Sequence, residues 1–223
     1  DIRSMQELGL KAYRFSLAWP RIMPEPGRVN PRGLDFYRRL VDGLLGAGIT
    51  PLATLFHWDI PAWLEDRGGF ARRDAVEALA EYGAAAFRGL GDVLKSWITL
   101  NEPFEYVGLG YLVGAFPPGR RADFRSLFHA AHHLLLGHAR LRQMFPGLVP
   151  GGKLGITLSQ NWITPRRPQS PRDREAAALM DEAYNRAFLD PVLLGRYPPL
   201  FARRFGRFFP RGFEEEAPGL RGL

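Results

Sequence analysis

An alternation of short apolar segments with longer amphipathic ones, repeated four times, constrains the fold of this chain most strongly. The short segments are predicted strands, and each amphipathic segment is a predicted helix long enough to cross back over a sheet. This pattern predicts parallel strands with helices packed outside them. The predicted strands are residues 12–17, 50–56, 96–101 and 153–158, and the helices that follow them begin near residues 31, 74, 123 and 171.

Right-handed crossovers predict that these strands are spatial neighbours in chain order, with helices on one side only. Alternation alone leaves both a barrel and a doubly wound sheet open. No predicted strand is followed by the glycine fingerprint of a dinucleotide or phosphate site. The pair Gly151-Gly152 does not count as such a fingerprint, because it precedes a predicted strand. We therefore expect no cofactor. Without a repeat, a linker or a low-complexity segment, residues 1–223 are predicted to belong to a single domain.

The composition narrows the class of protein. With 223 residues, of which 46% are hydrophobic, the chain can bury a sizeable core. Cysteine is absent, which excludes disulfides, thiolate nucleophiles and zinc–sulfur sites. No apolar run approaches the ~18 residues that cross a bilayer, and no signal segment opens the sequence. We expect a cytoplasmic protein.

The net charge of +7 raises binding to nucleic acid or to a membrane as an option. Lysine occurs only at positions 11, 95 and 153, so 30 − 3 = 27 basic residues are arginine. These arginines are spread along the chain, apart from a cluster that interleaves with phenylalanine near residues 203–211. The distribution indicates a coding bias, and we expect neither a nucleic-acid nor a membrane partner.

The third predicted strand ends in three residues that no strand requires, Asn101-Glu102-Pro103. Asn101 can donate and accept hydrogen bonds, and Glu102 can hold or release a proton. Pro103 predicts an extended backbone at Glu102, which would present the carboxyl group in one direction. Because α/β barrels keep their chemistry at the carboxyl ends of the strands, Glu102 is a candidate catalytic acid. The alternative is a residue that only caps the following turn.

Two other strands carry polar or aromatic groups that a core would not select. Arg14 lies in the first predicted strand, where burial on both faces would require a carboxylate partner unless this is an edge strand that reaches solvent. His57 closes the second strand and can donate to a hydroxyl group, although a structural histidine is the commoner case. Trp58 offers a flat apolar face of the kind on which sugar rings lie. Asp59 is predicted to cap the following segment.

Two further groups of titratable residues are candidates for a site. Histidines four positions apart share a helix face, which suggests a metal site, but their neighbours are core-forming leucines and no carboxylate repeats beside them; the histidines are His129, His132, His133 and His138. We expect no metal. The run of glutamates at 214–216 is predicted to be a solvated helix start. Glu105 lies close to Glu102 in sequence and stays a candidate second carboxylate.

Three separate motifs in register, extending over nearly the whole chain, resemble glycoside hydrolase family 1, the β-glucosidase family. Similar filler segments lie between them, and the segment Ala131–Ala139 is similar too. The motifs are Tyr13-Arg14-Phe15-Ser16 with Trp19-Pro20-Arg21, then Thr54-Leu55-Phe56-His57-Trp58-Asp59-Ile60-Pro61, and then Thr99-Leu100-Asn101-Glu102-Pro103.

This resemblance implies a (β/α)8 TIM barrel that hydrolyses small β-glycosides or oligosaccharides with retention of configuration. It implies that Glu102 is the general acid/base and that Asn101 binds the sugar 2-hydroxyl. His57 and Trp58 would line the subsite of the sugar whose bond is cut. Arg14 would lie beside the nucleophile, where a cation keeps a carboxylate ionised.

The chain departs from the family in one large respect. A retaining glycosidase needs a second carboxylate roughly 5–5.5 Å from the acid/base. In this family it lies in an Ile/Thr-Glu-Asn-Gly motif, which is missing from this sequence. The four strand–helix units match the second to fifth of the barrel, so we expect an internal fragment that is inactive alone. The alternatives are a sugar-binding partial barrel without chemistry and a basic nucleic-acid-binding scaffold. Sugar specificity and oligomeric state cannot be predicted.

Overall fold

The structure is a computed structural model, which describes residues 1–222. The chain forms two compact units, which are described separately. The first unit consists of Asp1–Gly69, Asp74–Asn101 and Arg140–Thr157. The second unit consists of Phe70–Arg73, Glu102–Ala139 and the described part of Leu158–Leu223. The single-domain assignment made from the sequence stays a prediction.

The first unit is built on a four-stranded parallel sheet with the order β1-β2-β3-β4. The predicted strands, their direction and their order are thereby confirmed, and β1 and β4 each end one residue earlier than predicted. The strands are β1 (Ala12–Ser16), β2 (Thr50–Phe56), β3 (Ser96–Asn101) and β4 (Lys153–Thr157).

The register assigns alternate residues to opposite faces of this sheet. Phe15, Ala53 and Trp97 pair across neighbouring strands and are almost fully buried. One residue earlier, Arg14 pairs with Leu52 on the other face, where Arg14 is exposed and Leu52 is partly exposed. Helices of this unit therefore cover the face that contains Phe15 and Trp97, as the sequence predicts. The opposite face is partly open, since Arg14 is exposed and Leu52 and Ile98 are half-buried.

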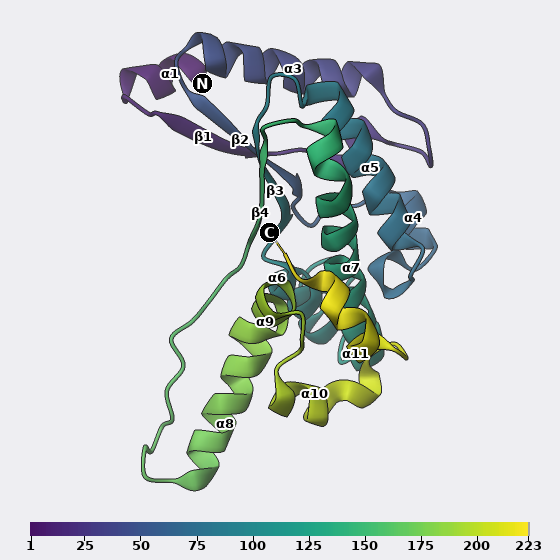
Figure 1. The fold of residues 1–223 in the computed structure, drawn as a ribbon, viewed down its shortest axis with the longest axis vertical. Coiled ribbons are helices and arrows are strands. Elements are labelled where there is room, and N and C mark those ends of the chain that lie inside the picture. The colour runs from purple at the N-terminus through teal and green to yellow at the C-terminus, as the bar shows by residue number, and fades with distance from the viewer. Residues whose placement is uncertain (223) are drawn as a thin grey trace. The chain divides into compact units, whose positions relative to one another are not determined.

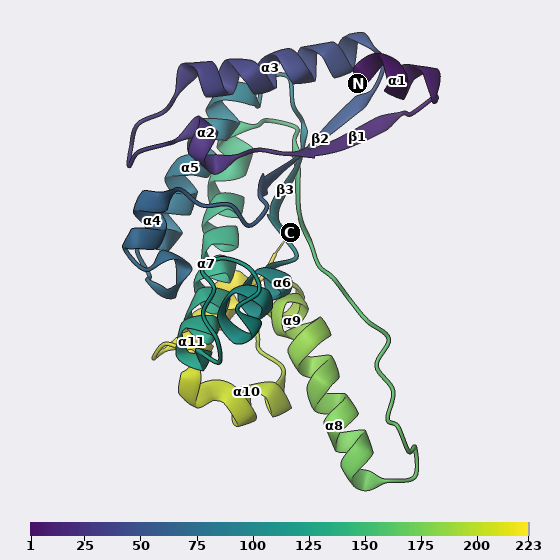
Figure 2. The same cartoon turned by 180° about the vertical axis from the view of Figure 1, so that it is seen from behind.

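Aromatic contacts join the covered face to the helices of this unit. Figures 1 and 2 draw these helices and the strands as ribbons. The ring of Phe15 stacks on Tyr37 of α3, and Trp97 meets Phe87 of α5 edge-on. Tyr82 donates a hydrogen bond to the carbonyl of Leu55 and so links α5 to β2. The helices of this unit are α1 (Ile2–Glu7), α2 (Trp19–Ile22), α3 (Pro31–Gly46), α4 (Ala62–Asp66) and α5 (Ala75–Leu90), followed by the last turns of α7 (Phe124–Leu148).

The second unit is helical. Phenylalanine rings fill its interior, and Phe128 of α7 contacts the rings of Phe201, Phe205, Phe208 and Phe209. Its elements, besides most of α7, are α6 (Pro103–Val107), the π-helix η2 (Gly108–Val113), α8 (Pro171–Asp181), the π-helix η3 (Glu182–Arg186), α9 (Ala187–Leu194), α10 (Pro199–Phe205), η4 (Gly206–Phe208), α11 (Phe213–Glu216) and η5 (Ala217–Leu220); the 3-10 turn η1 (Gly69–Ala71) leads into it.

Two helical segments contain residues that weaken a helix. The glycine- and proline-rich segment after Pro103 forms α6 and η2 as far as Val113. Helix α7 continues past Pro146 to Leu148. Pro146 has no N–H to donate to the carbonyl of Arg142, so α7 lacks one hydrogen bond near its end and continues for only two more residues. In residues 1–222, no helix has the length and apolarity that a membrane span requires.

Candidate active site

The guanidinium group of Arg14 organises the open face of the sheet. Its Nε donates to Thr54 Oγ1 at 2.8 Å, and its Nη2 donates to Asn101 Oδ1. Both acceptors are buried, whereas Arg14 itself is exposed. Of the two possibilities raised for Arg14, the structure agrees with an edge strand that reaches solvent, because β1 is the first strand of this four-stranded sheet. Among residues 1–222, no carboxylate forms a salt bridge with Arg14, so its charge is met only by neutral oxygens.

His57 and Trp58 follow β2 and are each held by a neighbouring strand. His57 Nδ1 lies 2.7 Å from the hydroxyl of Ser16, the last residue of β1. The Trp58 indole donates to the backbone carbonyl of Asn101 at 2.8 Å. Trp58 has a φ of 79°, a left-handed conformation that is rare for a bulky residue. These contacts fix the ring of a residue whose backbone is strained.

Glu102 has a left-handed backbone too, with φ 43° and ψ 60°, and is the N-cap of α6. The extended conformation predicted from Pro103 is therefore wrong. A proline disfavours the right-handed helical region for the residue before it, and the requirement to turn from β3 directly into α6 selects the left-handed region. Its backbone carbonyl accepts from the N–H of Glu105 at 3.0 Å. In residues 1–222, the non-glycine residues with positive φ are Trp58, Glu102 and Ala122.

Glu105, the candidate second carboxylate, is engaged elsewhere in the second unit. Its Oε1 accepts a 2.5 Å hydrogen bond from the hydroxyl of Tyr184, and this hydroxyl lies 3.1 Å from that of Ser159. The hydrogen bond with Glu105 raises the pKa of Tyr184. The ring of Tyr184 also packs against Phe104, with the centroids 4.4 Å apart. Glu105 therefore has a structural partner on η3.

The structure thus brings together four of the predicted site residues, which are Arg14, His57, Trp58 and Asn101. The position of the Glu102 carboxyl group relative to these side chains stays a prediction. Sequence reasoning missed Ser16 and Thr54, which hold His57 and Arg14. Ser16 lies two residues after Arg14, and both Ser16 and Thr54 place a small hydroxyl group on strands that were predicted to be adjacent. This was the only signal in the sequence, and the strand register is needed to show which side chains these hydroxyl groups contact.

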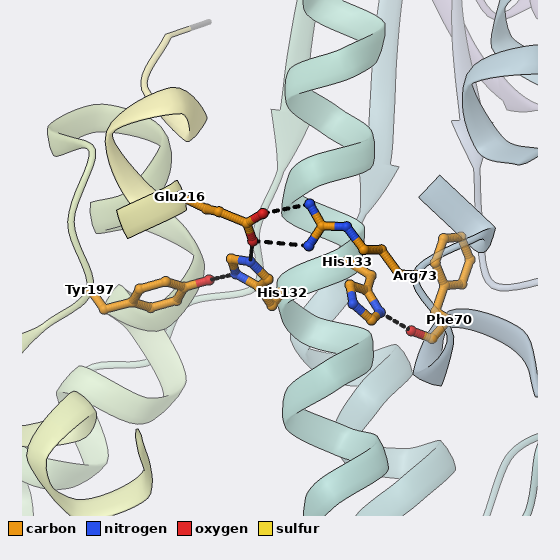
Figure 3. A network of polar contacts seen from close by, with 6 residues as sticks. All are labelled: Phe70, Arg73, His132, His133, Tyr197 and Glu216. Carbon is orange, nitrogen blue, oxygen red and sulfur yellow. Dashed lines mark hydrogen bonds and ion pairs between the residues drawn. The ribbon is translucent and has the colours of Figure 1, made fainter. Parts of the chain in front are cut away.

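A second polar group lies wholly within the helical unit (Figure 3). Both terminal nitrogens of Arg73 donate hydrogen bonds to the carboxylate of Glu216, at 2.5 and 3.1 Å. The Nε2 of His132 lies 2.7 Å from the same carboxylate, and its Nδ1 lies 2.7 Å from the hydroxyl of Tyr197. A carboxylate can only accept, so a neutral His132 donates from Nε2 and accepts from Tyr197 at Nδ1.

The pKa shifts of this network follow from burial and from the ion pair. The hydrogen bond from Arg73, assisted by that from His132, lowers the pKa of Glu216 to about 2. Burial lowers the pKa of His132 and raises that of Tyr197 well above its usual range. Burial also lowers the pKa of His133 to about 4, although its Nδ1 bonds to the Phe70 carbonyl at 2.8 Å. Both histidines are therefore neutral at pH 7.

The network corrects one expectation. Glu214 and Glu215 are exposed, as predicted for a solvated helix start, whereas Glu216 turns inward to Arg73 and His132. A run of like charges does not reveal which member faces a helix, so the sequence could not single it out. Among residues 1–222, no group of three histidine, aspartate or glutamate side chains is placed to hold a metal ion.

The chain is similar to known proteins along most of its length. The model of glycosyl hydrolase family 1 matches residues 1–217. A 1,4-beta-D-glucan glucohydrolase of Thermotoga neapolitana is 41% identical over 99% of this chain and 52% of its own length. A thermostable beta-glucosidase B of Thermobispora bispora is 52% identical over 89% of this chain and 40% of its own length.

Solved structures give the same result. The chain superimposes on a beta-glucosidase from Thermotoga maritima in complex with glucoimidazole with a TM-score of 0.94 at 40% identity, covering 98% of this chain and 50% of that one. The chain spans about half the length of the curated relatives that it matches. The four parallel strands are part of a TIM barrel of the kind these structures share. On the family match and these likenesses, the chain belongs to glycosyl hydrolase family 1.

Proposed function

We propose that this chain supplies the acid/base half of the active site of a retaining β-glycosidase that acts on terminal β-linked glucose or a similar sugar. One observation supports the proposal most. Asn101, at the carboxyl end of β3, has its amide oxygen fixed by Arg14, and it is followed by a glutamate with a left-handed backbone. Strained backbone concentrates at functional sites, because only a constraint from the surroundings maintains it.

In the proposed reaction, Glu102 first acts as the general acid, which protonates the glycosidic oxygen as the bond to the leaving group breaks. It then acts as the general base, which takes a proton from the water that releases the sugar. Because Arg14 donates to Oδ1, the Nδ2 side of the Asn101 amide points its N–H groups elsewhere and can donate to the sugar 2-hydroxyl. His57 and Trp58 would bind the same sugar by a hydrogen bond and by stacking.

The nucleophile is proposed to come from a second half of the barrel. Glu105 is bonded to Tyr184, which makes it a poor candidate. Arg14, whose charge is met only by neutral oxygens among the described residues, would pair with the incoming carboxylate and keep it ionised. The substrate class rests on the relatives, which are named beta-glucosidases and glucan glucohydrolases.

Complementation tests this proposal. Residues 1–223 are assayed for nitrophenol release from an aryl β-glucoside, alone and with a separately produced complementary half-barrel. We expect turnover only in the mixture. The Glu102→Gln variant should lower that turnover by ~10²–10⁴-fold, the usual contribution of general acid catalysis. Glu105→Gln on the same helix is the matched control and should leave turnover nearly unchanged.

Two other results would contradict the proposal. Turnover by the chain alone would show that it already contains a nucleophile, and loss of that turnover in Glu105→Gln would identify it. If Glu102→Gln left the turnover of the mixture unchanged, Glu102 would not be the general acid/base. The cytoplasmic location and the absence of a nucleic-acid partner stay predictions, which cell fractionation and a filter-binding assay would test.

A further inference from the structure

The helical unit contains an apolar cavity of about 210 Å³ that the proposed reaction does not use. Its walls come from α6, η2, α7, η3, α9 and α10, with further contributions from the end of α8 and from the segment after η4. All of these residues belong to the second unit. The cavity is therefore a property of this unit alone.

The chemistry of the wall defines what the cavity can bind. No charged side chain contributes to it, and most of the wall is phenylalanine, leucine and alanine. Tyr197 supplies the one side-chain hydroxyl of the wall, and His132 already binds this hydroxyl at 2.7 Å. A polar ligand would lose its hydration without finding new hydrogen bonds, which costs free energy. An apolar ligand would lose nothing and would bury its surface.

The cavity also has the size and the rigidity of a binding site. A dry apolar cavity of 150 Å³ is enough to bind benzene, and this one is larger. Its aromatic wall is braced, because the ring of Phe128 stacks on Phe205 and contacts Phe209. The cavity reaches solvent in part, since three of its wall residues are between a third and a half exposed: Leu112 at 41%, Phe124 at 38% and Met180 at 49%.

We propose that this cavity is a binding site for one small uncharged molecule with a single aromatic ring or a hydrocarbon ring of that size. Volume selects the size of the ligand, the wall excludes charge, and the surrounding phenylalanine rings offer edge and face contacts to an aromatic ligand. The proposal does not depend on the glycosidase assignment, because no carboxylate lines the cavity.

Toluene and benzoate are suitable probes, since they have nearly the same size and differ in charge. We expect toluene to raise the melting temperature of the full chain in a saturable manner, since a ligand that binds only the folded state stabilises it. Calorimetric titration should give one site per chain. Benzoate should have no effect. If benzoate stabilised the chain as much as toluene, the site would not be the apolar cavity.

Filling the cavity provides the decisive variants. Ala183→Leu and Ala131→Leu extend side chains from two different walls, η3 and α7, into the cavity. Ala178→Leu is the matched control, because it is an exposed position of α8 outside the cavity wall. Toluene binding should weaken at least about tenfold in either filled variant and stay unchanged in the control. Equal binding by all the variants, or no binding by the unaltered chain, would overturn the proposal.

Discussion

Two polar groups in this molecule use the same residue types in opposite ways. In the helical unit, Arg73 forms a two-pronged ion pair with Glu216, which also accepts from His132. On the open face of the sheet, Arg14 bonds to Thr54 and Asn101, both neutral. Both arginines are exposed, but the first is paired with a carboxylate, whereas the second is met by neutral oxygens among the described residues.

The difference supports the proposal that the first group stabilises the fold and that the second belongs to a binding site. A network in which a cation, a carboxylate and a buried histidine bond to one another stabilises the fold. An arginine that orients neutral groups contributes less to stability, but its remaining charge can attract a carboxylate or a substrate. We therefore expect changes in the first group to alter stability, and changes in the second to alter activity.

Acidification should give the largest effect on stability. His132 and His133 have folded-state pKa values below the ordinary 6.5, with His133 at about 4. Their contribution is present above pH 6.5 and is lost as the pH falls towards 4, because the unfolded chain takes up the protons first. Glu216, with a pKa lowered from 4.5 to about 2, adds a further loss between those pH values.

Urea unfolding from pH 8 to pH 2.5 would measure this dependence. The free energy of unfolding should rise with pH throughout the range below 6.5. The Glu216→Gln variant should flatten the curve below pH 4.5, and His133→Asn should flatten it between pH 6.5 and 4. If the curves of the variants ran parallel to that of the unaltered chain, other groups would be responsible.

Removing the charge of Glu216 should give the next largest effect. The Glu216→Gln variant leaves Arg73 and His132 without a carboxylate. Because Arg73 is exposed and its ion pair is screened by solvent, we expect a loss of about 1–2 kcal/mol in the free energy of unfolding at pH 7, mostly from the bond to buried His132. Glu215→Gln, at an exposed neighbour in the same helix, should change it by less than about 0.5 kcal/mol. Similar losses in both variants would show that the network has no special role.

A third prediction concerns the strained backbone at Glu102. Glycine adopts a left-handed conformation without cost, whereas alanine loses roughly 1–2 kcal/mol there. We therefore expect Glu102→Gly to be more stable than Glu102→Ala by about 1 kcal/mol. At Glu81, an exposed glutamate in the middle of α5, the order should be reversed, because glycine weakens a helix interior. The same order at both positions would mean that the left-handed conformation at Glu102 is not maintained in solution.

The smallest stability effect is expected on the open face of the sheet. Arg14→Met removes two hydrogen bonds, but it also removes an exposed charge that no carboxylate of the described residues balances. The free energy of unfolding should fall by less than about 1 kcal/mol, because water on the exposed side of Arg14 can replace the guanidinium at its two acceptors. A loss as large as that of Glu216→Gln would place Arg14 among the stabilising residues and weaken the comparison.

The sequence predicted the strands well because their pattern is local. Residues 50–56 and 96–101 have the bounds that were predicted, and the right-handed crossover rule ordered the strands. Helical extent was less predictable, since Pro146 lies inside α7 and two π-helices, η2 and η3, follow α6 and α8 directly. Proline and glycine signals weaken local helix formation, and tertiary packing overrides them.

For the candidate site, the sequence predicted residue types but not their conformations. It singled out Arg14, His57 and Asn101, and the register of β1, β2 and β3 brings them close together. It gave the wrong backbone for Glu102, because the rule for a residue before proline describes average behaviour and not a strand that turns directly into a helix. The inward turn of Glu216 depends on Arg73, which is 143 residues away in sequence.

The central claim is that the polar group on the sheet serves catalysis and the helical network serves stability. Parallel assays of Arg14→Met and Glu216→Gln test it most directly, each measured for melting temperature and for nitrophenol release by the complemented mixture per folded molecule. We predict that Arg14→Met keeps its melting temperature and loses most activity, while Glu216→Gln melts earlier and keeps its activity. The claim would be contradicted if Arg14→Met released nitrophenol at the unaltered rate, or if Glu216→Gln lost activity while melting normally.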